Sequence, residues 1–222
     1  MRLNETAFFI FILTAFLFIS LTASASAAED NLKNDISNGE KRSNSSPSSF
    51  SLAAPGFFSR LAAPERKAAA ISLASSYDPN FNLSSVSGSF AALYDHGQLW
   101  DNVKCDNTTF KLEAVAGALF RPEYRTVASV NMLSLYYPDF MKSREIRPYL
   151  EAGIGIIYTD YRVDGQAYRY NFNPQLGIGA EFKGEKGDTF YVAMRLHHVS
   201  NGGISCDNQG VNSLLFQIGK FY

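Results

Sequence analysis

The segment from His197 to Asn212 holds the side chains of this sequence that are best suited to chemistry. It reads HHVSNGGISCDNQGVN and contains two of the three histidines, a serine two residues after the second histidine, and a pair of glycines. A serine hydroxyl becomes a good nucleophile only when a neighbouring base takes its proton, and histidine is the commonest such base. Loops rich in glycine and asparagine also bind ligands without reacting with them. The residue types alone therefore leave a binding loop and a hydrolytic site both open.

The first 70 residues differ in composition from the rest of the chain. Residues 1–27 contain one early arginine, an apolar run from Ala7 to about Leu21 and small residues before Ala27. This order is typical of a secretory signal peptide cleaved near Ala27, and an uncleaved membrane anchor is the alternative. Residues 28–70 are rich in Ser, Asn, Ala and Pro, which predicts a flexible, low-complexity exported segment because such a stretch buries little apolar surface.

From about residue 71 onward, apolar and polar side chains alternate. In residues 168–182 every even position is apolar or aromatic and no odd position is. The same parity recurs in residues 148–158. Alternation of this kind places the two sets on opposite faces of a strand. The polar face is rich in Gly, Asn and Gln, which suits a narrow, hydrogen-bonded lumen, and the apolar face ends in aromatic residues, as at a membrane interface.

Eight segments follow this pattern, each long enough for a tilted membrane strand. They are residues 71–77, 86–95, 109–120, 126–137, 146–159, 167–183, 189–200 and 212–222. An even number of strands closes a barrel and leaves no unpaired edge in lipid. The sequence therefore predicts an all-β domain over residues 71–222, an eight-stranded antiparallel transmembrane β-barrel in a Gram-negative outer membrane. A lipocalin-like barrel and a secreted sandwich are the soluble alternatives.

Strand parity makes specific predictions about which face each side chain occupies. Leu176, Ile178 and Phe182 are expected to face lipid, whereas Gln175 and Glu181 are expected to face the lumen. Proline belongs at strand edges and bulges, so the proline at position 174 is the one irregularity in this strand.

The same parity separates the two adjacent histidines. His198 and Ser200 fall on the lipid-facing side, while His197 falls in the lumen. Asn212 shares the outer face on the next strand. Polar groups that face hydrocarbon cost free energy unless they are paired or useful. A cluster of three such residues at one rim of the barrel therefore favours a function at the outer wall.

At these residues the sequence resembles the PagL family of outer-membrane lipid A 3-O-deacylases. The family pattern is His-x-Ser-Asn-(Ala/Gly)-Gly followed by Asn-x-Gly-(Ile/Val)-Glu. It stands here as HVSNGG in residues 198–203 and NQGVN in residues 208–212. The segments IRPYLEAGIGIIYTDYRV and YNFNPQLGIGAEF also look like the family's fifth and sixth strands. The resemblance covers roughly residues 71–222 and is strongest from residue 146 onward.

The resemblance implies a serine esterase in which Ser200 is the nucleophile and His198 is the general base. It also implies an oxyanion hole made by backbone N–H groups around Asn201 and Gly203, with Asn208 supporting the loop. The implied substrate is lipid A of lipopolysaccharide, held among outer-membrane lipids, whose ester-linked 3-position acyl chain is removed by water. No cofactor is implied.

One position departs from the family pattern, because Asn212 stands where the family has glutamate. In serine proteases, exchanging the acid for its amide lowers kcat by about 10⁴, yet Cys-His-Asn hydrolases function with an amide. Three readings follow: an active Ser-His-Asn variant, a slow enzyme, or an inactive barrel with a structural or adhesion role. Asp207 lies in the same loop, but its odd parity and its spacing make it a poor substitute.

The remaining features of the sequence concern partners and cross-links. The net charge of −1 gives no sign of a nucleic-acid partner, and the spacing of cysteines and histidines shows no metal-ligand cluster.

Cys105 and Cys206 fall in loops at opposite ends of the predicted barrel, so no bridge between them is expected. Glu151 and Arg195 are expected to pair in the lumen, because a buried charge needs a partner. The sequence leaves open whether two chains form a homodimer.

Overall fold

The computed structural model describes residues 57–79, 83–99, 107–141, 143 and 145–222. The predicted signal peptide (residues 1–27), most of the predicted exported segment and Cys105 lie outside these residues. Cys206 lies within them as an exposed free thiol. Because Cys105 is not described, the absence of a bridge between the two cysteines stays a prediction. No helix in the described part of the chain is long and apolar enough to cross a membrane.

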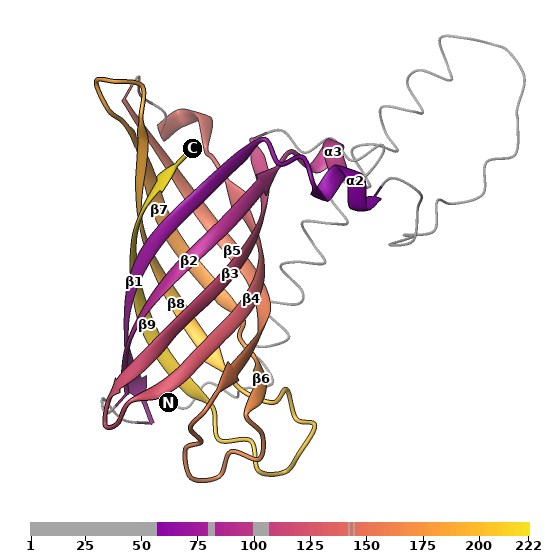
Figure 1. Cartoon of the computed structure of the whole chain (residues 1–222), viewed down its shortest axis with the longest axis vertical. Helices are drawn as coiled ribbons and strands as arrows, with labels where there is room; N and C mark the ends of the chain where they lie inside the picture. The colour runs from indigo at the N-terminus through magenta and orange to yellow at the C-terminus, as the bar shows by residue number, and fades with distance from the viewer. Residues whose placement is uncertain (1–56, 80–82, 100–106, 142, 144) are drawn as a thin grey trace, which may run out of the picture.

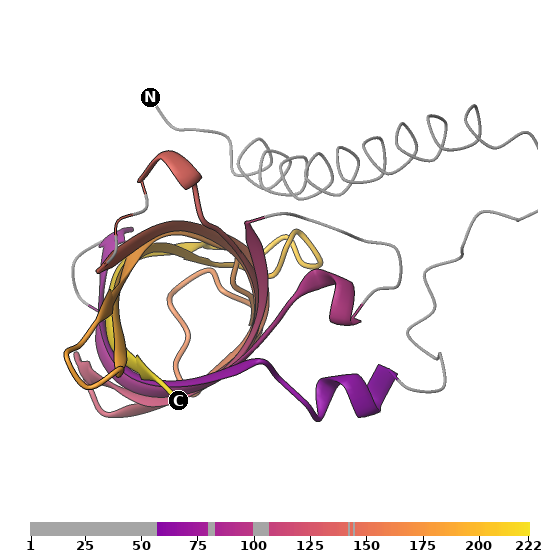
Figure 2. The same ribbon diagram turned by 90° about the horizontal axis from the view of Figure 1, so that it is seen from above.

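The described residues form a closed antiparallel β-barrel (Figures 1 and 2). Its strand segments are β1 (Arg66–Asp78), β2 (Ser84–Tyr94), β3 (Thr108–Arg121), β4 (Arg125–Tyr136), β5 (Ile146–Thr159), β6 (Tyr170–Phe172), β7 (Gln175–Lys183), β8 (Thr189–Val199) and β9 (Val211–Phe221). Consecutive segments pair with one another, except that β6 and β7 both pair with β5. β1 pairs with β9, and the pairing of β4 with β5 completes the ring. No strand edge is left for lipid, which is the condition for a sheet to span a bilayer.

Segments β6 and β7 are two parts of one strand. Both pair with β5 in a single register, and the bridge between Phe172 and Ser200 continues the register of β7 with β8. The interruption falls at Pro174, which has no N–H to donate to the ladder. The barrel therefore has eight strands, and the predicted fold is confirmed.

The first strand begins earlier than the sequence pattern predicted. β1 starts at Arg66, whereas the alternation became visible only at about residue 71. Residues 68–70 are three alanines, which carry no contrast between an apolar and a polar face. A short helix, α2 (Phe57–Leu61), precedes β1 and lies outside the barrel beside α3 (His96–Leu99), and a 3-10 turn, η1 (Asp139–Met141), follows β4.

The two faces of the strands are as predicted from parity. Leu176, Ile178 and Phe182 are 41%, 54% and 36% exposed on the outer wall, while Gln175 and Glu181 are buried inside. Similar apolar side chains cover the rest of the wall. They include Ile71, Leu73, Phe90, Val130, Leu150, Ile156, Met194, Phe216 and Ile218. An apolar surface of this extent on the outside of a closed barrel is what a lipid environment stabilises.

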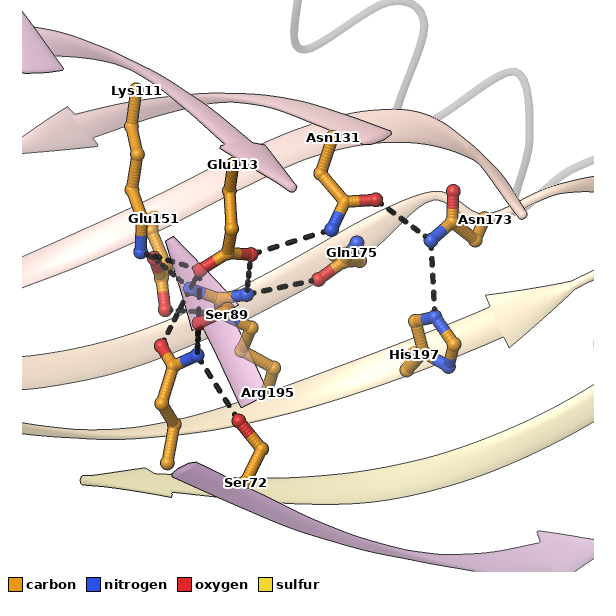
Figure 3. A network of polar contacts seen from close by, with 11 residues as sticks. Ser72, Ser89, Lys111, Glu113, Asn131, Glu151, Asn173, Gln175, Arg195 and His197 are labelled. Atoms are coloured by element: carbon orange, nitrogen blue, oxygen red, sulfur yellow. Dashed lines mark hydrogen bonds and ion pairs between the residues drawn. The ribbon is translucent and has the colours of Figure 1, made fainter. Parts of the chain in front are cut away.

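The lumen is filled by a charged network centred on Arg195 (Figure 3). The guanidinium donates to Glu151 at 2.7 Å and 3.1 Å and to Glu113 at 2.7 Å and 3.3 Å. Lys111 lies 3.0 Å from Glu113, and Gln217 accepts a further Arg195 hydrogen bond at 3.0 Å. The predicted pair of Glu151 with Arg195 is confirmed, and it is one part of a network of two cations and two carboxylates.

Glycines on the inner face make room for large side chains. A Cβ at Gly179 would lie 2.3 Å from the Tyr149 ring, and one at Gly219 would lie 2.3 Å from the Tyr191 ring. The glycines on the inward-facing positions of the strands thus reflect a packed interior and not an open pore.

Candidate functional site

The two adjacent histidines of strand β8 lie on opposite sides of the barrel wall. The His197 ring points inward, where its Nε2 atom lies 3.2 Å from Asn173 Nδ2 at the edge of the lumen network (Figure 3). His198 shares the outer face of β8 with Leu196, and it is in register with Asn212 at the end of β9 farthest from the C-terminus. It is only 8% exposed, so the ring is largely shielded although it faces outward.

His198 and Asn212 are in direct contact. The Nδ1 atom of His198 lies 2.6 Å from Asn212 Oδ1. An amide oxygen only accepts hydrogen bonds, so the contact requires a proton on Nδ1 and leaves Nε2 as the basic nitrogen. On the other side of β8, the His198 N–H donates to the carbonyl of Pro174 at 3.1 Å. The histidine is therefore fixed from both neighbouring strands.

The Asn212 amide has a second partner that the sequence pattern did not identify. Its Nδ2 atom donates to the Asp78 carboxylate at 2.7 Å. Asp78 is the last residue of β1, and a register shift between Ser76 and Asp78 brings it opposite Asn212. Ile71 faces outward, so strict alternation along β1 would place Asp78 in the lumen. The register shift instead turns the Asp78 side chain to the outer wall. The only feature of the sequence that could have indicated this placement is that Asp78 directly precedes Pro79.

Ser200 is held by its backbone next to Phe172. Its N–H donates to the Phe172 carbonyl at 3.1 Å, and its carbonyl accepts from the Phe172 N–H at 2.8 Å. The side chain is on the His198 face by parity, and the residue is 3% exposed. The structure shows no hydrogen bond between the Ser200 hydroxyl and the His198 ring, both of which it describes. Residues i and i+2 of a strand share a face but lie about 6 to 7 Å from each other.

The loop after Ser200 is braced by asparagine side chains. Asn208 Oδ1 accepts from the Asn201 N–H at 2.8 Å, and Asn201 Oδ1 accepts from the Gly203 N–H at 2.9 Å. Gly202 and Gly203 have φ angles of +68° and +83°, a region that side chains other than glycine rarely adopt. Of the N–H groups expected around the oxyanion hole, those of Asn201 and Gly203 are thus used within the loop. The Gly202 N–H has no acceptor among the described residues, and a Cβ on Gly202 would lie 3.2 Å from the Phe172 ring.

Two long loops meet at this rim. The Ala167 N–H donates to the Asp207 carbonyl at 3.0 Å, and the Gln209 N–H donates to the Gly165 carbonyl at 2.7 Å. A cleft of about 560 Å³ lies beside the loop between β5 and β6. Its lining includes Arg125, Arg162 and Arg169. Neither His198 nor Ser200 lines this cleft. The candidate site is therefore separate from this cleft.

The arrangement has the parts of an acid–base site. A shielded imidazole has its tautomer set by an amide, a serine follows on the same face, and glycine N–H groups lie directly beyond it. Such a set can take a proton from a hydroxyl and return it to a leaving group. In the described residues, no group of three or more His, Cys, Asp or Glu side chains is placed to hold a metal ion.

Comparisons with known proteins give the fold and the family. The structure resembles that described as "Crystal structure of the outer membrane enzyme PagL", with 20% sequence identity, a TM-score of 0.51, and coverage of 68% of this chain and 97% of that chain. It also resembles Neisserial surface protein A (NspA), with 14% identity, a TM-score of 0.50, and coverage of 70% and 93%. Among curated proteins, none matches the sequence significantly. The family described as lipid A 3-O-deacylase (PagL) matches residues 79–220, well over half of the chain. The protein therefore belongs to the PagL family of lipid A 3-O-deacylases.

Proposed function

We propose that this protein is an outer-membrane serine esterase that removes the ester-linked 3-position acyl chain from lipid A. The observation that carries the proposal is the contact between His198 and Asn212 on the outer wall, on the same face as Ser200. A hydrolytic site that faces the bilayer suits a substrate that stays in the membrane. The family membership supports the same substrate class.

The proposed reaction has two steps. In the first, His198 Nε2 takes the proton of Ser200, the Ser200 oxygen attacks the ester carbonyl, and the alkoxide of the sugar leaves with that proton. In the second, His198 takes a proton from water, the hydroxide attacks the acyl-serine, and the fatty acid leaves as Ser200 regains its proton. The Gly202 N–H is the donor available to the oxyanion of each tetrahedral intermediate. Rotation of the Ser200 side chain about χ1 turns its hydroxyl toward His198 when the substrate binds, since catalytic hydrogen bonds are often long in the free enzyme.

The surroundings of the site suit an acyl chain. Leu196 and Leu214 continue the outer face of β8 and β9 next to His198 and Asn212, and both are more than 40% exposed. With the end that carries the C-terminus in the periplasm, this rim lies at the outer leaflet, where lipid A resides. An acyl chain can then lie along the barrel wall while its ester bond reaches Ser200.

Mass spectrometry of lipid A tests the proposal directly. Cells that express the protein should contain lipid A lacking one ester-linked acyl chain, and cells that express Ser200→Ala at the same level should not. Ser213→Ala, a lumen serine on β9, is the matched control and should behave as the unmodified protein. Unchanged lipid A in cells with the unmodified, folded protein would instead favour a non-enzymatic barrel.

Asn212 provides a test of the variant site. Asn212→Ala should lower the rate of ester cleavage by tenfold or more, about 1.4 kcal/mol of activation free energy, because the imidazole loses the group that sets its tautomer. Asn212→Glu should keep or raise the rate, since a carboxylate stabilises the imidazolium that forms in the transition state. Release of fatty acid from lipid A in detergent micelles measures both. An Ala variant with an unchanged rate would show that Asn212 is a bystander.

A further inference from the structure

We propose that Asp78 is a positioning residue for this site, supplying through the Asn212 amide the orientation and negative charge that a neutral residue at position 212 lacks. The inference rests on the proposed function. Its starting observation is a chain of two hydrogen bonds, from His198 Nδ1 to Asn212 Oδ1 at 2.6 Å and from Asn212 Nδ2 to Asp78 Oδ2 at 2.7 Å. The family match begins at residue 79, directly after Asp78.

The Asp78 carboxylate fixes which way round the Asn212 amide lies. An asparagine side chain has one end that donates and one end that accepts, and alone it can present either end to a histidine. An ionised carboxylate only accepts. With Asp78 on one side, the NH₂ group must face the carboxylate and the oxygen must face His198. Asp78 thereby keeps the proton on Nδ1 and leaves Nε2 basic.

Without the carboxylate, no other residue described on the β1 side would hold the Asn212 amide in this orientation. A flipped Asn212 would point its NH₂ group at Nδ1, which then must accept, so the ring proton would move to Nε2. In that tautomer the nitrogen needed as a base is already protonated. This is the same fault that lowers kcat in serine proteases when the acid is replaced by its amide.

The position of Asp78 depends on a local irregularity at the end of β1. By parity it belongs in the lumen, and only the register shift after Ser76 turns it to the outer wall opposite Asn212. A carboxylate on a lipid-facing wall costs free energy unless it has a partner or a use. The Asn212 amide is its partner there. The backbone irregularity and the acidic side chain thus both serve the contact with Asn212.

The size of the effect follows from distance. The carboxylate is one amide farther from the imidazole than a glutamate at position 212 would be, and Coulomb energy falls with separation. The loss on removing Asp78 should therefore be smaller than the 10⁴-fold loss for a directly bonded acid, on the order of 10- to 100-fold in kcat. KM should change less than about twofold, because Asp78 acts on His198 and not on lipid A.

The test measures kcat and KM for lipid A deacylation by the refolded full chain in detergent micelles. Asp78→Ala should show the loss in kcat, and Asp78→Asn should show an intermediate loss, because its amide oxygen still accepts from Asn212 but carries no charge. Asp164→Asn is the matched control, since it removes one exposed carboxylate from the β5–β6 loop at the same rim. Its kcat should equal that of the unmodified protein. The heat-dependent shift in gel mobility of folded barrels confirms folding of each variant.

A second background separates positioning from a structural role. In Asn212→Glu, the new carboxylate contacts His198 directly and is repelled by Asp78, so adding Asp78→Ala there should leave kcat unchanged or raise it. An equal loss in both backgrounds, or an unchanged kcat for Asp78→Ala in the Asn212 protein, would overturn the proposal. These results are distinct from failure of the proposed function, in which the unmodified protein is no more active than Ser200→Ala.

Discussion

Replacing His198 with alanine should abolish lipid A deacylation, with a loss of at least about 10³-fold in kcat. The reason is that the Ser200 hydroxyl would have no base to take its proton, and the leaving alkoxide would have no acid to return it. The barrel should still fold, because the His198 ring lies on the outer wall and its backbone hydrogen bond to Pro174 does not depend on the side chain. Release of fatty acid by the refolded variant is the measurement.

The neighbouring histidine is the control for this prediction. His197→Ala removes the same ring from the same strand, but on the lumen side, where it contacts Asn173. Its deacylation rate should stay within about threefold of the unmodified protein, since neither partner reaches the outer wall. If the two variants exchanged these phenotypes, the assignment of His198 to the catalytic face would be wrong.

Replacing Arg195 with methionine should destabilise the barrel by about 3 to 5 kcal/mol. Methionine fills much of the same volume but leaves Glu113 and Glu151 with Lys111 as the only cation of the network. Two buried carboxylates would then face one ammonium group, and an unpaired buried charge is costly. Urea unfolding in detergent micelles, followed by circular dichroism or gel mobility, measures the free energy of unfolding.

A compensating variant tests the cause of that loss. Adding Glu151→Gln to Arg195→Met restores charge balance, with Lys111 opposite Glu113, whose Oε1 atom lies 3.0 Å away. The double variant should therefore be more stable than Arg195→Met alone. Equal stability of the two would mean that lost packing, and not the excess charge, accounts for the effect.

Much of the fold could be predicted from the sequence because side-chain alternation is a local property. Each strand must show one apolar and one polar face wherever lipid lies on one side and a filled lumen on the other. Residues 170–183 follow this rule closely, and the faces of Leu176, Gln175 and Glu181 were predicted from it alone. The start of β1 was not, since the alanines at 68–70 fit either face.

The local sequence also separated the two adjacent histidines. His197 and His198 differ by one position, and one position in a strand is a change of face. The lumen network could be predicted only in part. Parity placed Arg195 and Glu151 inside, but it gave no strand order or height, so the contacts with Glu113, Lys111 and Gln217 were not predicted.

The surroundings of Asn212 were decided by tertiary structure alone. Asp78 and Asn212 are 134 residues apart in the chain, and they meet because β1 and β9 close the barrel. A one-residue register shift then moves Asp78 from the lumen face to the outer face, against the alternation that holds through the rest of β1. The sequence by itself determined that a histidine, a serine and an asparagine share the outer wall at one rim. Only the closure of the sheet and the shift in its register placed a carboxylate beside them, because both depend on pairing between distant strands and not on the residues of either strand alone.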